Sequence, residues 1–202
     1  PEHDLVVRAA RLLQAHTGCQ LGADIAVHKV LPMGAGIGGG SSDAATTLIA
    51  LNRLWQTGLG RAELQTLGLQ LGADVPVFIF GRDAFAEGVG EALQPLELAP
   101  AWYVLVSPGV SIPTAEIFGA GDLTRNTPLI RMPDFAVSTT RNDLQAVACK
   151  RYPQVQSAID WLGQHAPARM TGSGSCVFAE VASAQHADWV AAQCPPAWTA
   201  WK

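Results

Sequence analysis

Five glycines fall within the seven positions from Gly34 to Gly40, directly before a segment with a helical pattern. A glycine has no Cβ and readily adopts positive φ, so successive backbone N–H groups can turn toward one anion. A helix that begins near Ser41 would add its unpaired N–H groups and the positive end of its dipole. The segment therefore predicts a polyphosphate cradle, in which Ser41 and Ser42 offer hydroxyl groups to a phosphate or to its Mg²⁺.

Other uses of the same glycines define the alternatives. A flexible connection, with Ser41 or Ser42 as a helix N-cap, would lose backbone entropy worth about 0.5–1 kcal/mol per glycine relative to alanine, which makes it the poorer explanation. A Walker A loop is excluded because no lysine follows the glycines. Gly34, Gly36 and Gly39 match the G-x-G-x-x-G spacing, so a nicotinamide-dependent oxidoreductase stays open as a second interpretation.

A carboxylate that could serve phosphate chemistry occurs at Asp74, in "GADVPVF". Phosphoryl transfer needs charge neutralisation, in-line positioning and a carboxylate able to accept the proton of the attacking hydroxyl. The residues alone favour a cap for a turn that starts at Val75, with Pro76 in its first turn, and leave the catalytic role open. Asp74 is thus a candidate for both roles.

Two further charged residues flank the glycines. Lys29 precedes them. Its ammonium group could contact a nucleotide, or the residue could simply be an exposed lysine on a strand, and the sequence favours neither role. Asp43 falls in the first turn of the expected helix, where a carboxylate favours the helix dipole but repels phosphate. We expect Asp43 to serve in capping.

Composition limits the classes of function. The formal charge is -4, from 13 Lys and Arg against 17 Asp and Glu, and no basic run offers a footprint for nucleic acid. The four cysteines are scattered without a C-x-x-C pair and are expected to be reduced, buried thiols, and the five histidines lack metal-ligand spacing. No apolar stretch approaches the roughly 20 residues that span a bilayer. We expect a cytoplasmic protein with a small-molecule substrate, without nucleic acid, membrane or protein-held metal, and leave its oligomeric state open.

Hydrophobic periodicity predicts helices and strands along the whole chain. The expected helices are 5–16, capped by Asp4, then 41–55, 61–71, 143–152, capped by Asn142, 154–166 and 183–194. The expected strands are 24–31, 75–80, a hairpin within 84–96, 102–109, and two strands joined by a glycine turn within 168–181. This mixture indicates an α+β protein rather than a parallel βαβ series. Prolines and lost periodicity between Pro95 and Pro100 indicate a domain boundary.

Two glycine motifs resemble those of the GHMP kinases. "PMGAGIGGGSSDAATTL" is similar to the second motif of that family, and "MTGSGSCVFA" is similar to its third. The segments "LGADVPVF", "AFAEGVGE", "PGVSIPTAEIF" and "NDLQ" resemble the branch that phosphorylates a diphosphocytidyl alcohol in the non-mevalonate isoprenoid pathway. The resemblance covers essentially the whole chain.

The resemblance implies a two-lobed α+β fold. The N-terminal lobe, residues 1–95, would be related to a ribosomal protein domain and bind ATP, and the C-terminal lobe, residues 96–202, would be ferredoxin-like. The implied reaction is ATP-dependent phosphorylation of one substrate hydroxyl, with Mg²⁺ accompanying the nucleotide. Another GHMP kinase with a different alcohol, or a non-catalytic nucleotide-binding remnant, are the alternatives.

Residue by residue, the resemblance makes Asp74 the catalytic carboxylate. The expected ATP-binding residues are Lys29, Pro32, Met33, Gly34, Ala35, Gly36, Ile37, Gly38, Gly39, Gly40, Ser41 and Ser42. Phe118 would stack on the cytosine, and the other substrate-binding residues would be Thr114, Gly172, Ser173 and Gly174. A core position for Phe118, a helix cap for Thr114 and a plain hairpin turn at 172–174 are the structural alternatives.

The start of the chain departs from the family pattern. The family carries a Lys-Leu-Asn-Leu type motif near its N-terminus, whose lysine partners the catalytic aspartate, and Tyr and His residues that read the cytosine; none of these is in this sequence, which opens at Pro1. We therefore expect the native N-terminus, and any targeting peptide, to lie outside it. A further expectation is that the chain by itself is inactive, because it lacks this N-terminal motif.

Overall fold

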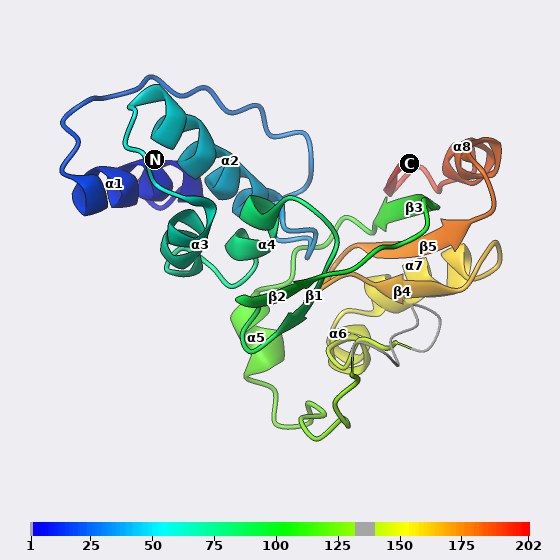
Figure 1. Cartoon of the computed structure of the whole chain (residues 1–202). Coiled ribbons are helices and arrows are strands. Elements are labelled where there is room, and N and C mark those ends of the chain that lie inside the picture. The colour runs from blue at the N-terminus through cyan, green and yellow to red at the C-terminus, as the bar shows by residue number, and fades with distance from the viewer. Residues whose placement is uncertain (1, 132–139) are drawn as a thin grey trace. The chain divides into compact units, whose positions relative to one another are not determined.

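The structure is a computed structural model that describes residues 2–131 and 140–202 (Figure 1). The chain divides into two units, Pro1–Leu31 with Gly38–Leu98, and Pro32–Ile37 with Ala99–Lys202. The glycine loop contributes its first part to the second unit and its last part to the first unit. The predicted domain limits of 1–95 and 96–202 stay a prediction.

Helices dominate the first unit, in the blue to green part of Figure 1. Helix α1 (Leu5–Thr17) begins after Asp4, whose Oδ1 accepts the N–H of Val6 at 2.9 Å, and ends at Gly18 with a φ of +69°. Helices α2 (Gly39–Leu54), α3 (Arg61–Leu69) and α4 (Val75–Phe80) follow. One apolar cluster joins the four, with members that include Leu13, Leu48, Leu67, Val75 and Ile79. The predicted helices 5–16, 41–55 and 61–71 are confirmed, with shifts at their ends.

The predicted strand at 75–80 is wrong, because these residues form α4. The buried positions are Val75, Pro76 and Ile79, a helical spacing rather than an alternation. Pro76 lies in the first turn, where a missing N–H costs no helical hydrogen bond, and Gly81 ends the helix at a φ of +73°. The β-branched and aromatic composition alone had suggested a strand.

The predicted strand at 24–31 is also wrong. Residues 19–30 have no regular secondary structure, and Ile25 and Val27 are exposed. Alternating apolar residues make a strand only when a neighbouring strand takes up their backbone N–H and C=O groups. No described strand pairs with this segment.

The hairpin of the first unit is confirmed. Strands β1 (Ala84–Glu87) and β2 (Ala92–Pro95) pair antiparallel, with Phe85 opposite Gln94. Gly88 and Gly90 both have positive φ in the turn between them.

In the second unit the described strands form a sheet in the order β4-β5-β3-β6, and every described pairing is antiparallel. The strands are β3 (Trp102–Ser107), β4 (Ala168–Met170), β5 (Val177–Val181) and β6 (Thr199–Trp201). Helices α5 (Thr114–Phe118), α6 (Gln145–Arg151) and α7 (Pro153–Leu162) lie between β3 and β4 in the chain, and α8 (Ala184–Ala192) lies between β5 and β6. This βαββαβ order is ferredoxin-like, which confirms the α+β class and the expected C-terminal fold.

One face of this sheet carries the core of the second unit. Val104 and Val106 of β3 alternate into it, and Val177 and Ala179 of β5 join them. The helices α7 and α8 supply the opposing side chains, among them Val155, Ala158, Leu162, Ala187 and Val190. Sequence analysis predicted every strand of the sheet except the short β6.

The cysteines are free thiols, but only Cys176 is buried, whereas Cys19, Cys149 and Cys194 are half-buried. The expectation of four buried thiols is therefore wrong for three of them. Burial raises the pKa of the Cys176 thiol to about 11, against a smaller opposing effect of a hydrogen bond with Ser107.

Two leucines of the second unit offer a test of its core. Leu162 is fully buried in the cluster, whereas Leu129 is 97% exposed. We expect Leu162→Ala to lower the free energy of unfolding by about 2–5 kcal/mol, because the lost transfer energy and the cavity add. The matched change Leu129→Ala should stay within about 0.5 kcal/mol of the parent. Urea unfolding measures both, and similar losses for the two variants would contradict this packing.

Candidate active site

Helix α2 begins at Gly39, before the predicted start near Ser41, and its N-cap is Gly38 with a φ of +71°. The first intrahelical bond runs from the N–H of Ser42 to the carbonyl of Gly38 at 2.9 Å. No side chain caps the helix, so the amides of residues 39–41 have no partner inside it. Ser41 and Ser42 lie within the first turn, and the alternative that made one of them the N-cap is wrong.

The space around these glycines differs between neighbouring positions. A Cβ added at Gly38 would lie 2.9 Å from the Phe78 ring of α4, so only glycine permits this approach at positive φ. A Cβ added at Gly39 would meet no described atom within 4 Å. The start of this 16-residue helix thus combines uncapped amides, the positive end of the helix dipole and free space on the Cβ side of Gly39. Uncapped amides at a helix start are a common anion-binding feature of proteins.

The first part of the glycine loop is joined to the second glycine motif, within the second unit. The carbonyl of Ala35 accepts the N–H of Cys176 and the hydroxyl of Thr171, both at 3.1 Å, although Thr171 lies 136 residues away in the chain. A Cβ added at Gly36 would lie 2.8 Å from the backbone nitrogen of Gly174. Gly36 thus serves a backbone-to-backbone contact, a role that sequence analysis did not assign to it.

The turn at 172–174 is held by side chains from two other segments. The hydroxyl oxygens of Ser173 and Thr114 are 2.9 Å apart. Asn142 donates from Nδ2 to the carbonyl of Gly172 at 2.7 Å and to that of Met170 at 3.0 Å, while its Oδ1 accepts the N–H of Leu144. Asn142 was predicted only as a helix cap, and its hydrogen bonds to the carbonyls of Met170 and Gly172 were not predicted.

Helix α5 carries the two other acceptor candidates. Its N-cap is Pro113, without a side-chain cap bond, so the cap alternative for Thr114 is wrong. Phe118, the last residue of α5, is 51% exposed, so its core alternative is wrong as well. An exposed ring and a hydroxyl therefore project from one short helix of the second unit.

Asp74 belongs to the first unit and directly precedes α4, but its side chain makes no cap hydrogen bond. Asp4, in contrast, caps α1 through its carboxylate. The hairpin turn packs beside Asp74: a Cβ added at Gly90, whose φ is +115°, would lie 2.8 Å from the carbonyl oxygen of Ala73. The cap interpretation of Asp74 thus loses its main support, and its carboxylate stays exposed for chemistry.

Lys29 lies between two carboxylates of the first unit. Its ammonium group donates a hydrogen bond to Asp43 and lies 4.0 Å from Asp4. The hydrogen bond with Asp43 raises the pKa of Lys29. Asp43 therefore pairs with Lys29, which corrects the capping role expected for it, and Lys29 does not lie on a strand.

The described residues offer neither a cluster of metal-ligating side chains nor a helix that could span a membrane. In residues 2–131 and 140–202, no three His, Cys, Asp or Glu side chains gather in a way that could hold a metal ion. Protein sites for Mg²⁺ commonly use only one or two carboxylates and rely on substrate phosphates for the rest. Among the same residues, no helix is both long and apolar enough to cross a membrane.

The sequence and the fold were compared with those of known proteins. The model of the GHMP kinases N-terminal domain matches residues 4–82, and that of the GHMP kinases C-terminal domain matches residues 130–198. The 4-diphosphocytidyl-2-C-methyl-D-erythritol kinases of Aromatoleum aromaticum and of Azoarcus sp. are 71% and 72% identical, respectively, over 100% of this chain and 71% of their own length.

A solved structure agrees with these relatives. The crystal structure of a 4-(cytidine 5'-diphospho)-2C-methyl-D-erythritol kinase superposes with a TM-score of 0.82 and 33% identity, over 99% of this chain and 77% of that one. The expected two-lobed α+β fold is thereby confirmed. The two matching family models, the 71% sequence identity and this superposition show that the chain belongs to the GHMP kinase family.

Proposed function

We propose that the chain transfers phosphate from ATP to a hydroxyl of 4-diphosphocytidyl-2-C-methyl-D-erythritol, in the non-mevalonate isoprenoid pathway. Its curated relatives at 71% and 72% identity carry the name of that kinase. The observation that carries the proposal is the uncapped start of α2, which offers amides and a helix dipole to a polyphosphate. Residues 1–95 would form the ATP-binding domain and 96–202 the C-terminal domain.

On the donor side, the ATP phosphates would lie against residues 38–42, where the amides of 39–41 lack intrahelical partners. Ser41 and Ser42 would offer hydroxyl groups to a phosphate or to Mg²⁺ carried with the nucleotide. Residues 32–37 would complete the binding loop. Lys29 would contribute less, since Asp43 already holds its ammonium group.

On the acceptor side, the exposed ring of Phe118 would stack on the cytosine, a contact worth about 1–3 kcal/mol per base. Thr114 and the turn at 172–174 would contact the diphosphate region through hydroxyl and amide groups. The hydrogen-bond distance between the Thr114 and Ser173 hydroxyls supports grouping them in one subsite.

Asp74 would accept the proton of the attacking hydroxyl or hold that hydroxyl in line. The oxygen of the alcohol forms a bond to the γ-phosphorus as the bond to ADP breaks. The hydroxyl proton passes to the carboxylate if Asp74 is the base, and to water if Asp74 only orients the hydroxyl. An exposed carboxylate without a cap bond is available for this task.

The alternatives fare differently. A dinucleotide-binding fold is built from βαβ units with parallel strands. Every described strand pairing here is antiparallel, so the oxidoreductase hypothesis loses its support. Another alcohol substrate, or a remnant that binds ATP without turnover, would be detected by the assays below.

We also propose a cytoplasmic location, because it suits a kinase that uses ATP and a diphosphocytidyl metabolite. Nucleic acid is not expected as a partner.

The change Asp74→Asn tests the catalytic assignment. We expect it to lower kcat by about 10²–10⁴-fold with little change in KM for either substrate, because general-base assistance is lost while the shape is kept. Release of ADP from Mg-ATP, with and without the diphosphocytidyl alcohol, measures this in protein expressed from its complete coding sequence. The control is Asp83→Asn, an exposed aspartate of the same unit. Full activity of Asp74→Asn would refute the assignment.

The change Gly39→Ala tests the phosphate cradle. A Cβ at Gly39 meets nothing within 4 Å, so the fold should tolerate it, but the methyl group would project into the space proposed for phosphate. We expect KM for ATP to rise by about tenfold, equivalent to about 1.4 kcal/mol, with an unchanged melting temperature. Gly22→Ala, equally open and in the same unit, should leave KM unchanged. An unchanged KM for ATP in Gly39→Ala would rule out a cradle at this helix start.

A further inference from the structure

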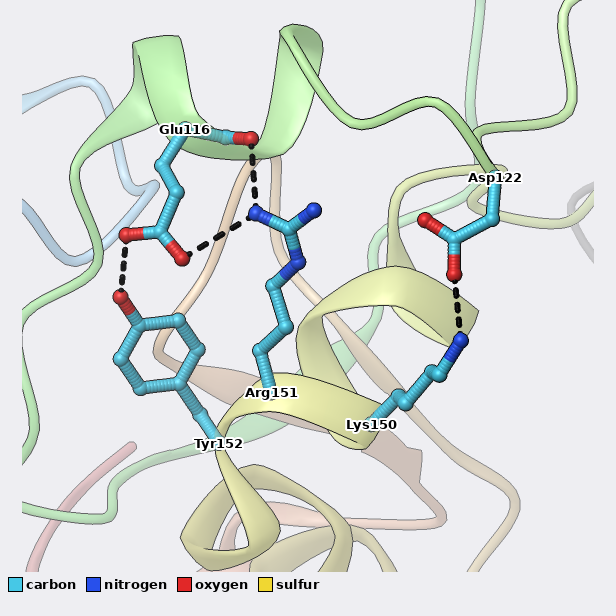
Figure 2. A network of polar contacts seen from close by, with 5 residues as sticks. All are labelled: Glu116, Asp122, Lys150, Arg151 and Tyr152. Carbon is cyan, nitrogen blue, oxygen red and sulfur yellow. Dashed lines mark hydrogen bonds and ion pairs between the residues drawn. The ribbon is translucent and has the colours of Figure 1, made fainter.

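One residue of helix α5, Glu116, makes polar contacts with the ends of two neighbouring helices, and it lies between Thr114 and Phe118 (Figure 2). Its Oε2 accepts the hydroxyl of Tyr152 at 2.7 Å, and its Oε1 accepts Nη1 of Arg151 at 3.2 Å. The same Nη1 also donates to the main-chain carbonyl of Glu116 at 3.2 Å. Arg151 ends α6 and Tyr152 is the N-cap of α7, so one side chain joins three helices.

This attachment matters because α5 has only five residues. Helices this short are not stable alone in water, so outside contacts must hold α5 in place. Ile117 supplies one of them as the only buried residue of α5. Ile117 fixes the helix to the core. The contacts of Glu116 oppose its rotation about that anchor, together with the hydrogen bond between Thr114 and Ser173 and the one from Arg125 to the carbonyl of Phe118.

The electrostatics favour a charged Glu116. The hydrogen bond from Tyr152, and then Arg151, hold the pKa of the Glu116 carboxyl below its usual range. The same carboxylate raises the pKa of Tyr152, which keeps its hydroxyl protonated as a donor. At neutral pH the carboxylate therefore only accepts, and both of its partners only donate to it.

We infer that Glu116 is a positioning residue for the acceptor: held by Arg151 and Tyr152, it fixes α5 and thereby the Phe118 ring and the Thr114 hydroxyl at the cytidine end of the substrate. This inference rests on the proposed function. Glu116 itself touches neither the reacting atoms nor ATP. Its loss should therefore weaken acceptor binding and leave the donor side and the chemical step unchanged.

A second ion pair in the same region provides the control. Lys150 of α6 donates to Oδ2 of Asp122 at 2.7 Å, and this pair is more open to solvent than that of Glu116 (Figure 2). Asp122 lies beyond the end of α5. Asp122→Asn thus removes one exposed carboxylate charge next to α6 and weakens its electrostatic interaction with Arg151, but leaves the hydrogen bonds of Glu116 with Arg151 and Tyr152 in place.

The experiment compares Glu116→Ala, Glu116→Gln, Tyr152→Phe and Asp122→Asn in protein expressed from its complete coding sequence. We expect Glu116→Ala to raise KM for the diphosphocytidyl alcohol about tenfold, with kcat and KM for ATP within about twofold of the parent. Glu116→Gln and Tyr152→Phe should give smaller rises, because one partner contact survives in each. Asp122→Asn should match the parent.

Amide hydrogen exchange at residues 115–120 gives a readout that needs no substrate. The amide of Gly119 bonds to the carbonyl of Ala115 at 2.9 Å, so its exchange reports on the integrity of α5. We expect faster exchange there in Glu116→Ala and parent-like exchange in Asp122→Asn. Unchanged exchange in Glu116→Ala would overturn the positioning role, whatever the substrate.

The kinetic outcomes separate the two claims. A parent enzyme that does not phosphorylate the diphosphocytidyl alcohol would overturn the proposed function and, with it, the assignment of the cytidine end to α5. An active parent with an unchanged acceptor KM in Glu116→Ala would overturn only the inference. Equal rises of both KM values, or the same rise in Asp122→Asn, would indicate a general structural effect and also overturn it.

Discussion

The close approach of glycine backbones is the constraint on which the rest of the structure depends. Gly36 lies so near the turn at 172–174 that any side chain would collide with main-chain atoms, and Gly38 lies as close to the Phe78 ring. Between these two glycines the chain passes from the second unit to the first. The loop therefore has two tasks: its first part packs on the ferredoxin-like unit, and its last part opens α2 without a capping side chain.

Local signals predicted most helices and every described antiparallel strand except β6. Asp4 and Gly18 mark the two ends of α1. Each signal was readable from the sequence because one residue suffices for it: an aspartate can cap a helix start, and a glycine can adopt the left-handed conformation that ends a helix. The strand predictions at 24–31 and 75–80 failed for other reasons. At 75–80, β-branched and apolar composition fits both a strand and a short buried helix. At 24–31, alternation makes a strand only beside a partner strand. Their states depend on neighbours: the first finds no described strand beside it, and the second buries Val75 and Ile79 against the other helices.

The candidate site was predictable only in part. The glycine loop, Asp74 and Phe118 stand out by residue type or by resemblance, because their roles follow from groups that they carry themselves. Asn142 and Glu116 could not be found in this way. Their partners, Gly172 and the pair of Arg151 and Tyr152, lie 30 or more residues away, and polar side chains at helix ends commonly serve only as caps. The "NDLQ" segment was the one signal that pointed to Asn142.

The central claim is that the start of α2 holds the phosphates of ATP. The most direct test is a crystal structure with a non-hydrolysable ATP analogue and Mg²⁺, solved for the protein expressed from its complete coding sequence. The account predicts phosphate oxygens within about 2.7–3.2 Å of the backbone nitrogens of Gly39, Gly40 and Ser41. Phosphates bound elsewhere, with these amides facing only water, would contradict it.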